Sequence, residues 1–328
     1  MKKYLLIGAI GFVLIFIVET VFLTTYFGAG VLVFLFFLII MIITVGKLGR
    51  ENLNAESSEM GLYLEIKREQ IRYFQKGEGK DVLLVHGTPG SLEDWQPLID
   101  SLARTHRVTA FDRPGHGYSS ANQIDYSLER NATIIDGLIE KLALGNVVLV
   151  GHSYGGIIAV HVAVNQNPKI ASVVIVAAPL YHIEVNGMLH ILTMPLLGKG
   201  FCVFLARTVA PKMMEQVIID LFNGNRDKVS NDFIDCRKKI WAQPKVIYAM
   251  SKEIVNAQRQ LNEITAKYPN INVPVTIVVG EEDKKTIIED SKEAQAVIPN
   301  SKLVIFENSA HYVQYEKSEA LSELIRGL

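Results

Sequence analysis

The stretch VVLVGHSYGGIIAV, residues 147–160, places a single serine between two apolar runs. Its first four residues are rich in β-branched side chains, as in a fully buried strand, and apolar residues recur at helical spacing after Gly156. Gly151 and Gly155 each stand two residues from Ser153, where the absence of a Cβ lets neighbouring backbone pass close by. The stretch therefore predicts a strand, a sharp turn and a helix, with the Ser153 hydroxyl raised above the edge of a sheet.

A serine hydroxyl is a weak nucleophile at neutral pH, so it needs a base within hydrogen-bond reach and an acid that orients the base. The sequence offers a candidate for each part. Asp283 follows the apolar run VTIVV in a tight turn, and His311 follows the run KLVIF in a short loop. Because parallel sheets gather functional groups at the carboxyl ends of their strands, we expect both residues near Ser153.

Strand-like apolar runs alternate with helical patterns along residues 62–328. The alternation predicts an α/β domain with a mostly parallel, doubly wound sheet and helices on both faces. The runs that end at Pro179 and begin at Val273 are much farther apart than an ordinary connection allows. We therefore expect a helical cap or lid insertion at about residues 180–270.

The motifs HGTPGS, DRPGHGYS, GHSYGG, GEED and SAHYVQYE follow one another in this order. On these motifs, residues 62–328 resemble the α/β-hydrolase superfamily of the serine lipase/esterase type. The resemblance implies that Ser153 is the nucleophile, His311 the general base and Asp283 the acid that orients the base.

The resemblance also implies an oxyanion hole made of two backbone N–H groups, those of Thr88 and Tyr154. The acid has rivals in the same turn, because Glu281 or Glu282 could replace Asp283 in that role. We favour Asp283, since the family places its acid three residues after the glycine of this turn.

Other polar residues of the same motifs have simpler interpretations. His86, His116 and His152 are expected to hold loops or line the cleft rather than take the proton. Asp112 of DRPGHG is expected to pin its own turn. Relatives that open epoxides or remove halide carry aspartate at the centre of the GHSYGG motif, so a serine there disfavours those reactions.

The N-terminal region differs from the rest of the chain, because Glu19 is its only charged residue between positions 4 and 45. Residues 1–48 predict a transmembrane hairpin with spans at about 4–23 and 30–46, followed by a polar linker over 49–61. Lysines and arginines flank both ends of the hairpin, which predicts a catalytic domain on the cytoplasmic face. A cleaved signal peptide is the alternative.

The composition limits the partners and cofactors. The formal net charge is −1, so we expect no nucleic-acid partner. Cys202 and Cys236 are the only cysteines and have no metal-ligand spacing. A serine mechanism also needs no cofactor, so we expect neither a metal nor a cofactor.

Together these features predict a membrane-anchored serine hydrolase that cleaves carboxylic esters through an acyl-enzyme. The expected partners are the membrane bilayer and a small-molecule ester or lipid, such as a monoacylglycerol or a lysophospholipid. Three alternatives stay open: a carbon–carbon bond hydrolase of the same fold, an aminopeptidase of the same fold, and a non-catalytic hydrolase-like interaction module.

The first part of the expected insertion, residues 188–206, is densely apolar. If part of this surface faces the cleft, Leu196 and Phe204 would contact an acyl chain, and longer acyl groups would be preferred. The alternative is an unusually apolar helix that packs inside the insertion.

Overall fold

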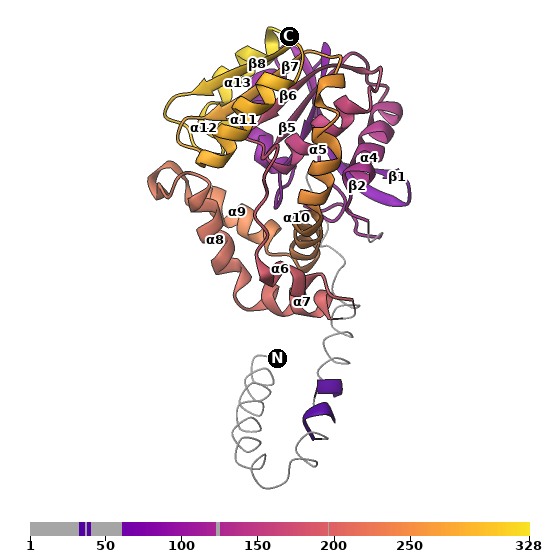
Figure 1. Cartoon of the computed structure of the whole chain (residues 1–328), viewed down its shortest axis with the longest axis vertical. Coiled ribbons are helices and arrows are strands. Elements are labelled where there is room, and N and C mark those ends of the chain that lie inside the picture. The colour runs from indigo at the N-terminus through magenta and orange to yellow at the C-terminus, as the bar shows by residue number, and fades with distance from the viewer. Residues whose placement is uncertain (1–32, 37, 41–60, 123–124, 196) are drawn as a thin grey trace.

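The computed structural model describes residues 33–36, 38–40, 61–122, 125–195 and 197–328. An α/β body and a helical insert form two parts of the molecule (Figure 1). The body consists of one sheet between two layers of helices, and the insert lies at one end of it.

The sheet has eight strands in the order β1-β2-β4-β3-β5-β6-β7-β8. Strands β3 to β8 are parallel, whereas β2, near one edge, pairs antiparallel with both β1 and β4. The strands are β1 (Leu62–Ile66), β2 (Glu69–Lys76), β3 (Lys80–Val85), β4 (His106–Phe111), β5 (Val147–His152), β6 (Ile170–Val176), β7 (Val275–Gly280) and β8 (Ser301–Phe306). Every residue of β5 and β7 is buried, as expected for central strands that are covered on both faces. The predicted mostly parallel α/β sheet is confirmed.

Helices cover both faces of this sheet. On one face, α4 (Leu128–Lys141), α5 (Tyr154–Val164) and α11 (Lys285–Val297) share a core with one set of strand side chains. On the other face, α3 (Gln96–Leu102), α12 (Val313–Glu316) and α13 (Ser318–Arg326) pack on the alternate set. This arrangement follows from the period of two in a strand, which sends successive side chains to opposite faces.

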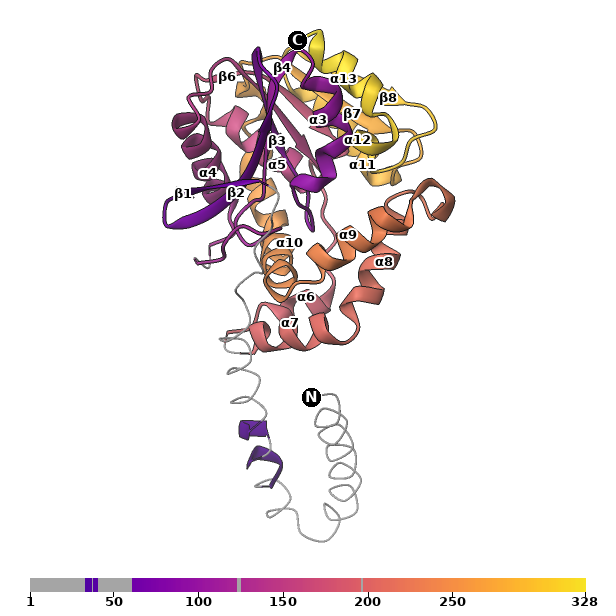
Figure 2. The ribbon, with the colours of Figure 1, turned by 180° about the vertical axis from the view of Figure 1, so that it is seen from behind.

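The described chain between β6 and β7 is helical. It contains α6 (Gly187–Leu192), α7 (Gly198–Arg207), α8 (Ala210–Asp220), α9 (Asn231–Trp241) and α10 (Pro244–Thr265). The helix starts agree with their sequences, since Asn186 and Ser230 cap α6 and α9 and a proline opens α10. These helices lie together at one end of the body (Figure 2). They enclose a separate core that includes Phe222 and Trp241.

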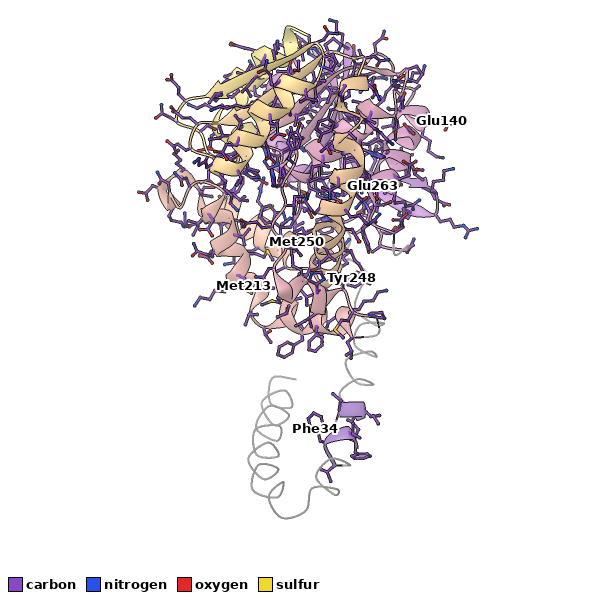
Figure 3. The ribbon with its side chains drawn as sticks, viewed as in Figure 1. Phe34, Glu140, Met213, Tyr248, Met250 and Glu263 are labelled. Carbon is purple, nitrogen blue, oxygen red and sulfur yellow. The ribbon has the colours of Figure 1, made fainter. Side chains whose placement is uncertain are left out.

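Helix α10 joins the insert to the body. Tyr248 and Met250 lie in the insert, and Glu263 lies beside the body near the other end of the same helix (Figure 3). The core contacts follow this division, because Tyr248 belongs to the core of the insert and Leu261 to the core of the body.

The two predicted spans, at about 4–23 and 30–46, and the linker over 49–61 fall largely outside the described residues. A helix needs about 20 consecutive apolar residues to cross the hydrocarbon core of a bilayer. Across the described ranges, no helix combines that length with that apolarity. This finding contradicts the predicted localisation, which was a two-span membrane anchor with a cytoplasmic catalytic domain. That prediction is therefore withdrawn.

Candidate active site

Ser153 occupies the turn between β5 and α5, with φ 52° and ψ −121°. A positive φ is strained for a residue with a Cβ and occurs mainly where the surrounding structure imposes it. The surroundings here are tight, since a Cβ at Gly155 would lie 2.1 Å from the carbonyl oxygen of Val85. A Cβ at Gly151 would lie equally close to the carbonyl oxygen of Gly155. Both glycines are therefore required for the sharp turn that presents the serine.

His311 and Asp283 meet in the loops that follow β8 and β7. The Nδ1 atom of His311 lies 3.0 and 3.1 Å from the two carboxylate oxygens of Asp283. The Asp283 side chain is almost fully buried, and that of His311 keeps 14% of its surface exposed. Because a carboxylate only accepts, Nδ1 carries the proton and donates it, which leaves Nε2 of His311 as an acceptor.

These three residues line one cavity of about 490 Å³. The structure thus brings together Ser153, Asp283 and His311 from three distant parts of the sequence. The other lining residues come from the loops after β6 and β7, from the start of α11, from α8 and the turn after it, and from the loop before His311; they are Pro179, His182, Ile183, Glu184, Val217, Asp220, Leu221, Asn223, Glu282, Lys284, Thr286, Ile287 and Ala310.

The lining carries more negative than positive charge. Glu184, Asp220 and Lys284 are exposed lining residues, so they lie at the mouth, where the cavity opens to solvent. His182 is exposed there as well and is paired with Asp290 at 2.8 Å. Glu282 is paired instead with Lys228, at 3.0 Å, and does not reach His311 in the way that Asp283 does. Ligands with a negative charge are therefore disfavoured at this mouth.

Leu196 and Phe204 are the two residues predicted to contact an acyl chain. Phe204 lies on α7 with 48% of its surface exposed, and it is not among the described lining residues. Its neighbour Cys202 is buried in the core of the insert, and Val203 is buried as well, so much of the apolar run serves packing. Leu196 lies outside the described residues.

The loop with Thr88 approaches Ser153 from β3. A Cβ at Gly87 would lie 3.0 Å from the Cβ of Ser153, so this loop presses against the turn of the serine. Tyr154 is the first residue of α5, where backbone N–H groups have no partner within the helix. Both segments that were predicted to supply oxyanion donors therefore adjoin Ser153.

The motif histidines hold loops, as predicted. Nε2 of His86 accepts from the backbone N–H of Arg113 at 3.0 Å, and its Nδ1 donates to the carbonyl oxygen of Gly87 at 2.8 Å. Complete burial lowers the pKa of His86 well below its ordinary value, so the ring is neutral. Asp112 pins its own turn by accepting from the backbone N–H groups of Tyr118 and Leu92.

Two buried charged residues next to the site were not predicted from the sequence. Arg113 stands in the motif DRPGHG, and Glu253 lies in α10; both side chains are fully buried and form an ion pair. The sequence contains a weak signal for Arg113, because it adjoins other motif residues. Glu253 has none, since a single acid in a long polar helix is ordinary.

The alpha/beta hydrolase family matches residues 82–324, and the chain belongs to this family. It is 25% identical to the dihydrolipoyllysine-residue acetyltransferase component of the acetoin cleaving system of Cupriavidus necator, over 80% of this chain and 67% of that protein. It is 26% identical to 2-hydroxy-6-oxo-2,4-heptadienoate hydrolase of Pseudomonas putida, over 84% of this chain and 96% of the relative.

A solved esterase from Exiguobacterium antarcticum has the same fold, with a TM-score of 0.64 and 21% identity over 82% of this chain and 98% of that one. The chain is therefore a hydrolase of the alpha/beta fold. The names of these proteins describe different activities, because one fold can host many reactions.

Proposed function

We propose that the protein is a serine hydrolase that cleaves carboxylic esters through an acyl-enzyme. The observation that carries the proposal is the Asp283–His311 hydrogen bond beside a serine held at positive φ on the same cavity. The pair supplies an oriented base, and the strained turn supplies a nucleophile that lines the cavity.

In this mechanism the Ser153 hydroxyl attacks the ester carbonyl and passes its proton to Nε2 of His311. Backbone N–H groups of Thr88 and Tyr154 stabilise the oxyanion of the tetrahedral intermediate. His311 then returns the proton to the leaving alcohol, and water hydrolyses the acyl-enzyme by the same steps. Asp283 keeps the imidazole in the required tautomer and stabilises the imidazolium.

An ester fits the cavity better than the substrate named for the heptadienoate relative. That substrate is a carboxylate, and Glu184 and Asp220 at the mouth would repel it. The same negative charges are compatible with the aminopeptidase alternative, because they would attract the protonated amine of a peptide substrate. An ester panel with an amino-acid anilide as a further substrate separates these cases.

A lipid-like monoester, such as a monoacylglycerol or a lysophospholipid, is the finer version of the proposal. The apolar lining residues that support it are Ile183, Val217, Leu221 and Ile287. Each methylene that is buried against these apolar residues contributes about 0.8 kcal/mol to the binding free energy. The kcat/KM should therefore rise with acyl length until the chain extends beyond these residues. An enzyme that prefers acetyl over decanoyl esters tenfold would contradict this finer version only.

The class is tested by covalent labelling. A fluorophosphonate should label the wild type at Ser153 and leave Ser153→Ala unlabelled, and ester turnover should fall by roughly a million-fold in this variant. Labelling at another residue, or ester turnover that Ser153→Ala retains, would overturn the proposal. A folded wild type that neither labels nor hydrolyses any member of the panel would favour the non-catalytic module.

A further inference from the structure

The peptide group between Gly87 and Thr88 is held from its oxygen side. The carbonyl oxygen of Gly87 accepts from Nη2 of Arg113 at 2.8 Å and from Nδ1 of His86 at 2.8 Å. In a trans peptide the C=O and N–H bonds lie in one plane and point in opposite directions. Two bonds on this oxygen therefore fix the direction of the Thr88 N–H, one of the two oxyanion donors in the proposed function.

Arg113 also contacts the residues around this peptide. Its Nε donates to the carbonyl oxygen of His86 at 3.1 Å, and its guanidinium carbon lies 5.2 Å from the centre of the Tyr154 ring. A single buried side chain thus contacts the segments that carry both oxyanion donors. Few residues could replace it, because only a planar guanidinium offers this many donors in a fixed fork.

Glu253 holds Arg113 from the opposite side. Its carboxylate bonds Nη1 of Arg113 through Oε1, and Oε2 lies 3.1 Å from Nη2 of Arg113 and 3.1 Å from Nε2 of His116. Burial by itself raises the pKa of Glu253, but Arg113 and His116 outweigh burial and hold the pKa at about 2. The acid is therefore ionised at any pH at which the protein would work.

This ion pair connects the insert to the body. Glu253 belongs to α10, whereas Arg113 follows β4, and no surface of either side chain is exposed. Buried ion pairs are weak contributors to stability, because the cost of removing two charges from water offsets much of their attraction. A positional role explains better than stability why the pair is placed against the oxyanion loop.

We infer that Glu253 is a positioning residue for the oxyanion hole: it orients Arg113, and Arg113 fixes the peptide that carries the Thr88 N–H. The inference rests on the proposed serine mechanism and adds a role for the insert in that mechanism. The helical insert contributes to transition-state stabilisation without contacting the reacting atoms.

The test compares two charge-neutralising substitutions. Glu253→Gln keeps the shape of the side chain but weakens the hold on Arg113. The matched control is Arg237→Gln, which breaks another buried ion pair between insert and body, Arg237–Asp94 at 3.2 Å, with no bond to the Gly87 carbonyl. Rates are normalised to active sites counted by fluorophosphonate labelling, so that a misfolded fraction does not count as slow catalysis.

For Glu253→Gln we expect kcat on a neutral nitrophenyl ester to fall about 10–100-fold, with KM changed less than about twofold. The affinity for an alkyl boronic acid, whose serine adduct mimics the tetrahedral intermediate, should fall by a similar factor. Arg237→Gln should change kcat and boronate affinity less than about threefold. A purely structural role would lower the number of active sites and the melting temperature, without this split between kcat and KM.

A second variant tests the inference even if Glu253→Gln fails to fold. Glu253→Asp keeps the charge and shortens the reach by one methylene, so it should fold and give a smaller loss of kcat and boronate affinity. Wild-type kcat and boronate affinity in Glu253→Asp and in any folded Glu253→Gln would overturn the inference, and so would equal losses in Arg237→Gln. A wild type that neither labels nor hydrolyses esters would instead overturn the proposed function, and this inference with it.

Discussion

The Nε2 atom of His152 lies 3.0 Å from the backbone carbonyl oxygen of His311, and the two imidazole rings pack with their centres 4.9 Å apart. A carbonyl oxygen only accepts, so Nε2 of His152 carries the proton and donates it. Since His152 directly precedes Ser153, this bond ties the strand of the proposed nucleophile to the loop of the proposed base.

His152 should make stability depend on pH in a defined direction. Burial, followed by the nearby His311, lowers the pKa of His152 well below its ordinary value of 6.5. In the unfolded chain the ring takes up a proton as the pH falls through about 6.5, whereas the buried ring stays neutral. The unfolded state then binds more protons, so the stability that the neutral ring provides is complete above that pH and declines below it.

The variant His152→Gln isolates this effect, because glutamine can still donate to the His311 carbonyl but does not titrate. We expect the melting temperature of the wild type to exceed that of the variant at pH 8, and this difference to shrink as the pH is lowered to 5. Other titrating groups act on both proteins and cancel in the comparison. A difference that stays constant or grows towards pH 5 would contradict the prediction.

The acid of the triad can be distinguished from its neighbour. Asp283→Asn keeps the shape but offers an amide where His311 Nδ1 needs a carboxylate, so the favoured tautomer changes and kcat should fall by about 10⁴-fold. Glu282→Gln is the matched control, because Glu282 is paired with Lys228 and should change kcat less than about threefold. Steady-state kinetics on one ester check both, and a larger loss in Glu282→Gln would reverse the assignment.

The glycine that adjoins the serine turn gives a prediction about packing. A Cβ at Gly155 would lie 2.1 Å from the Val85 carbonyl and 2.6 Å from that of His86, so Gly155→Ala must push back the strand end that leads to the oxyanion loop. We expect a loss of about 1–3 kcal/mol in the free energy of unfolding, together with lower activity. Gly187→Ala is the control, since no described atom outside its chain neighbours and its own helix backbone lies within 4 Å of an added Cβ, and it should be neutral or slightly stabilising.

Local sequence patterns were sufficient to predict the sheet and the turn of Ser153. Only a few backbone conformations can join a buried strand to a helix through a turn with such closely spaced glycines. The φ of 52° at Ser153 belongs to one of these conformations. Asp283 and His311 were predictable for a related reason, because each follows a recognisable strand. The parallel arrangement of those strands then brings the two loops together.

The Arg113–Glu253 pair could not be predicted in this way. The two residues are 140 positions apart, and their contact depends on how the insert packs against the body. The same limit applies to Phe204, because helical spacing identifies an apolar stripe but not the surface that it faces. Its neighbours Cys202 and Val203 are buried, Cys202 in the core of the insert, whereas Phe204 is exposed on α7.

The charge of the cavity mouth should appear as substrate selectivity. Three esters of one alcohol share a four-carbon acyl chain and differ in its end: butyrate is neutral, hemisuccinate is anionic, and 4-(trimethylammonio)butyrate is cationic. Because Glu184 and Asp220 line the mouth, we expect kcat/KM for the hemisuccinate to be about tenfold below that for the butyrate, and the cationic ester to be at least as good as the butyrate. The gap should narrow in about 1 M salt, where exposed charges are screened within about 3 Å.

A double variant, Glu184→Gln with Asp220→Asn, supplies the control for this selectivity. Both residues are exposed, so the substitutions should leave the melting temperature and the turnover of the neutral butyrate ester close to wild type. The hemisuccinate should gain kcat/KM in this variant, and the cationic ester should lose its advantage. If the wild type instead prefers the hemisuccinate tenfold, Lys284 or another cation dominates the approach, and a carboxylate-bearing substrate like that of the heptadienoate relative becomes the better proposal.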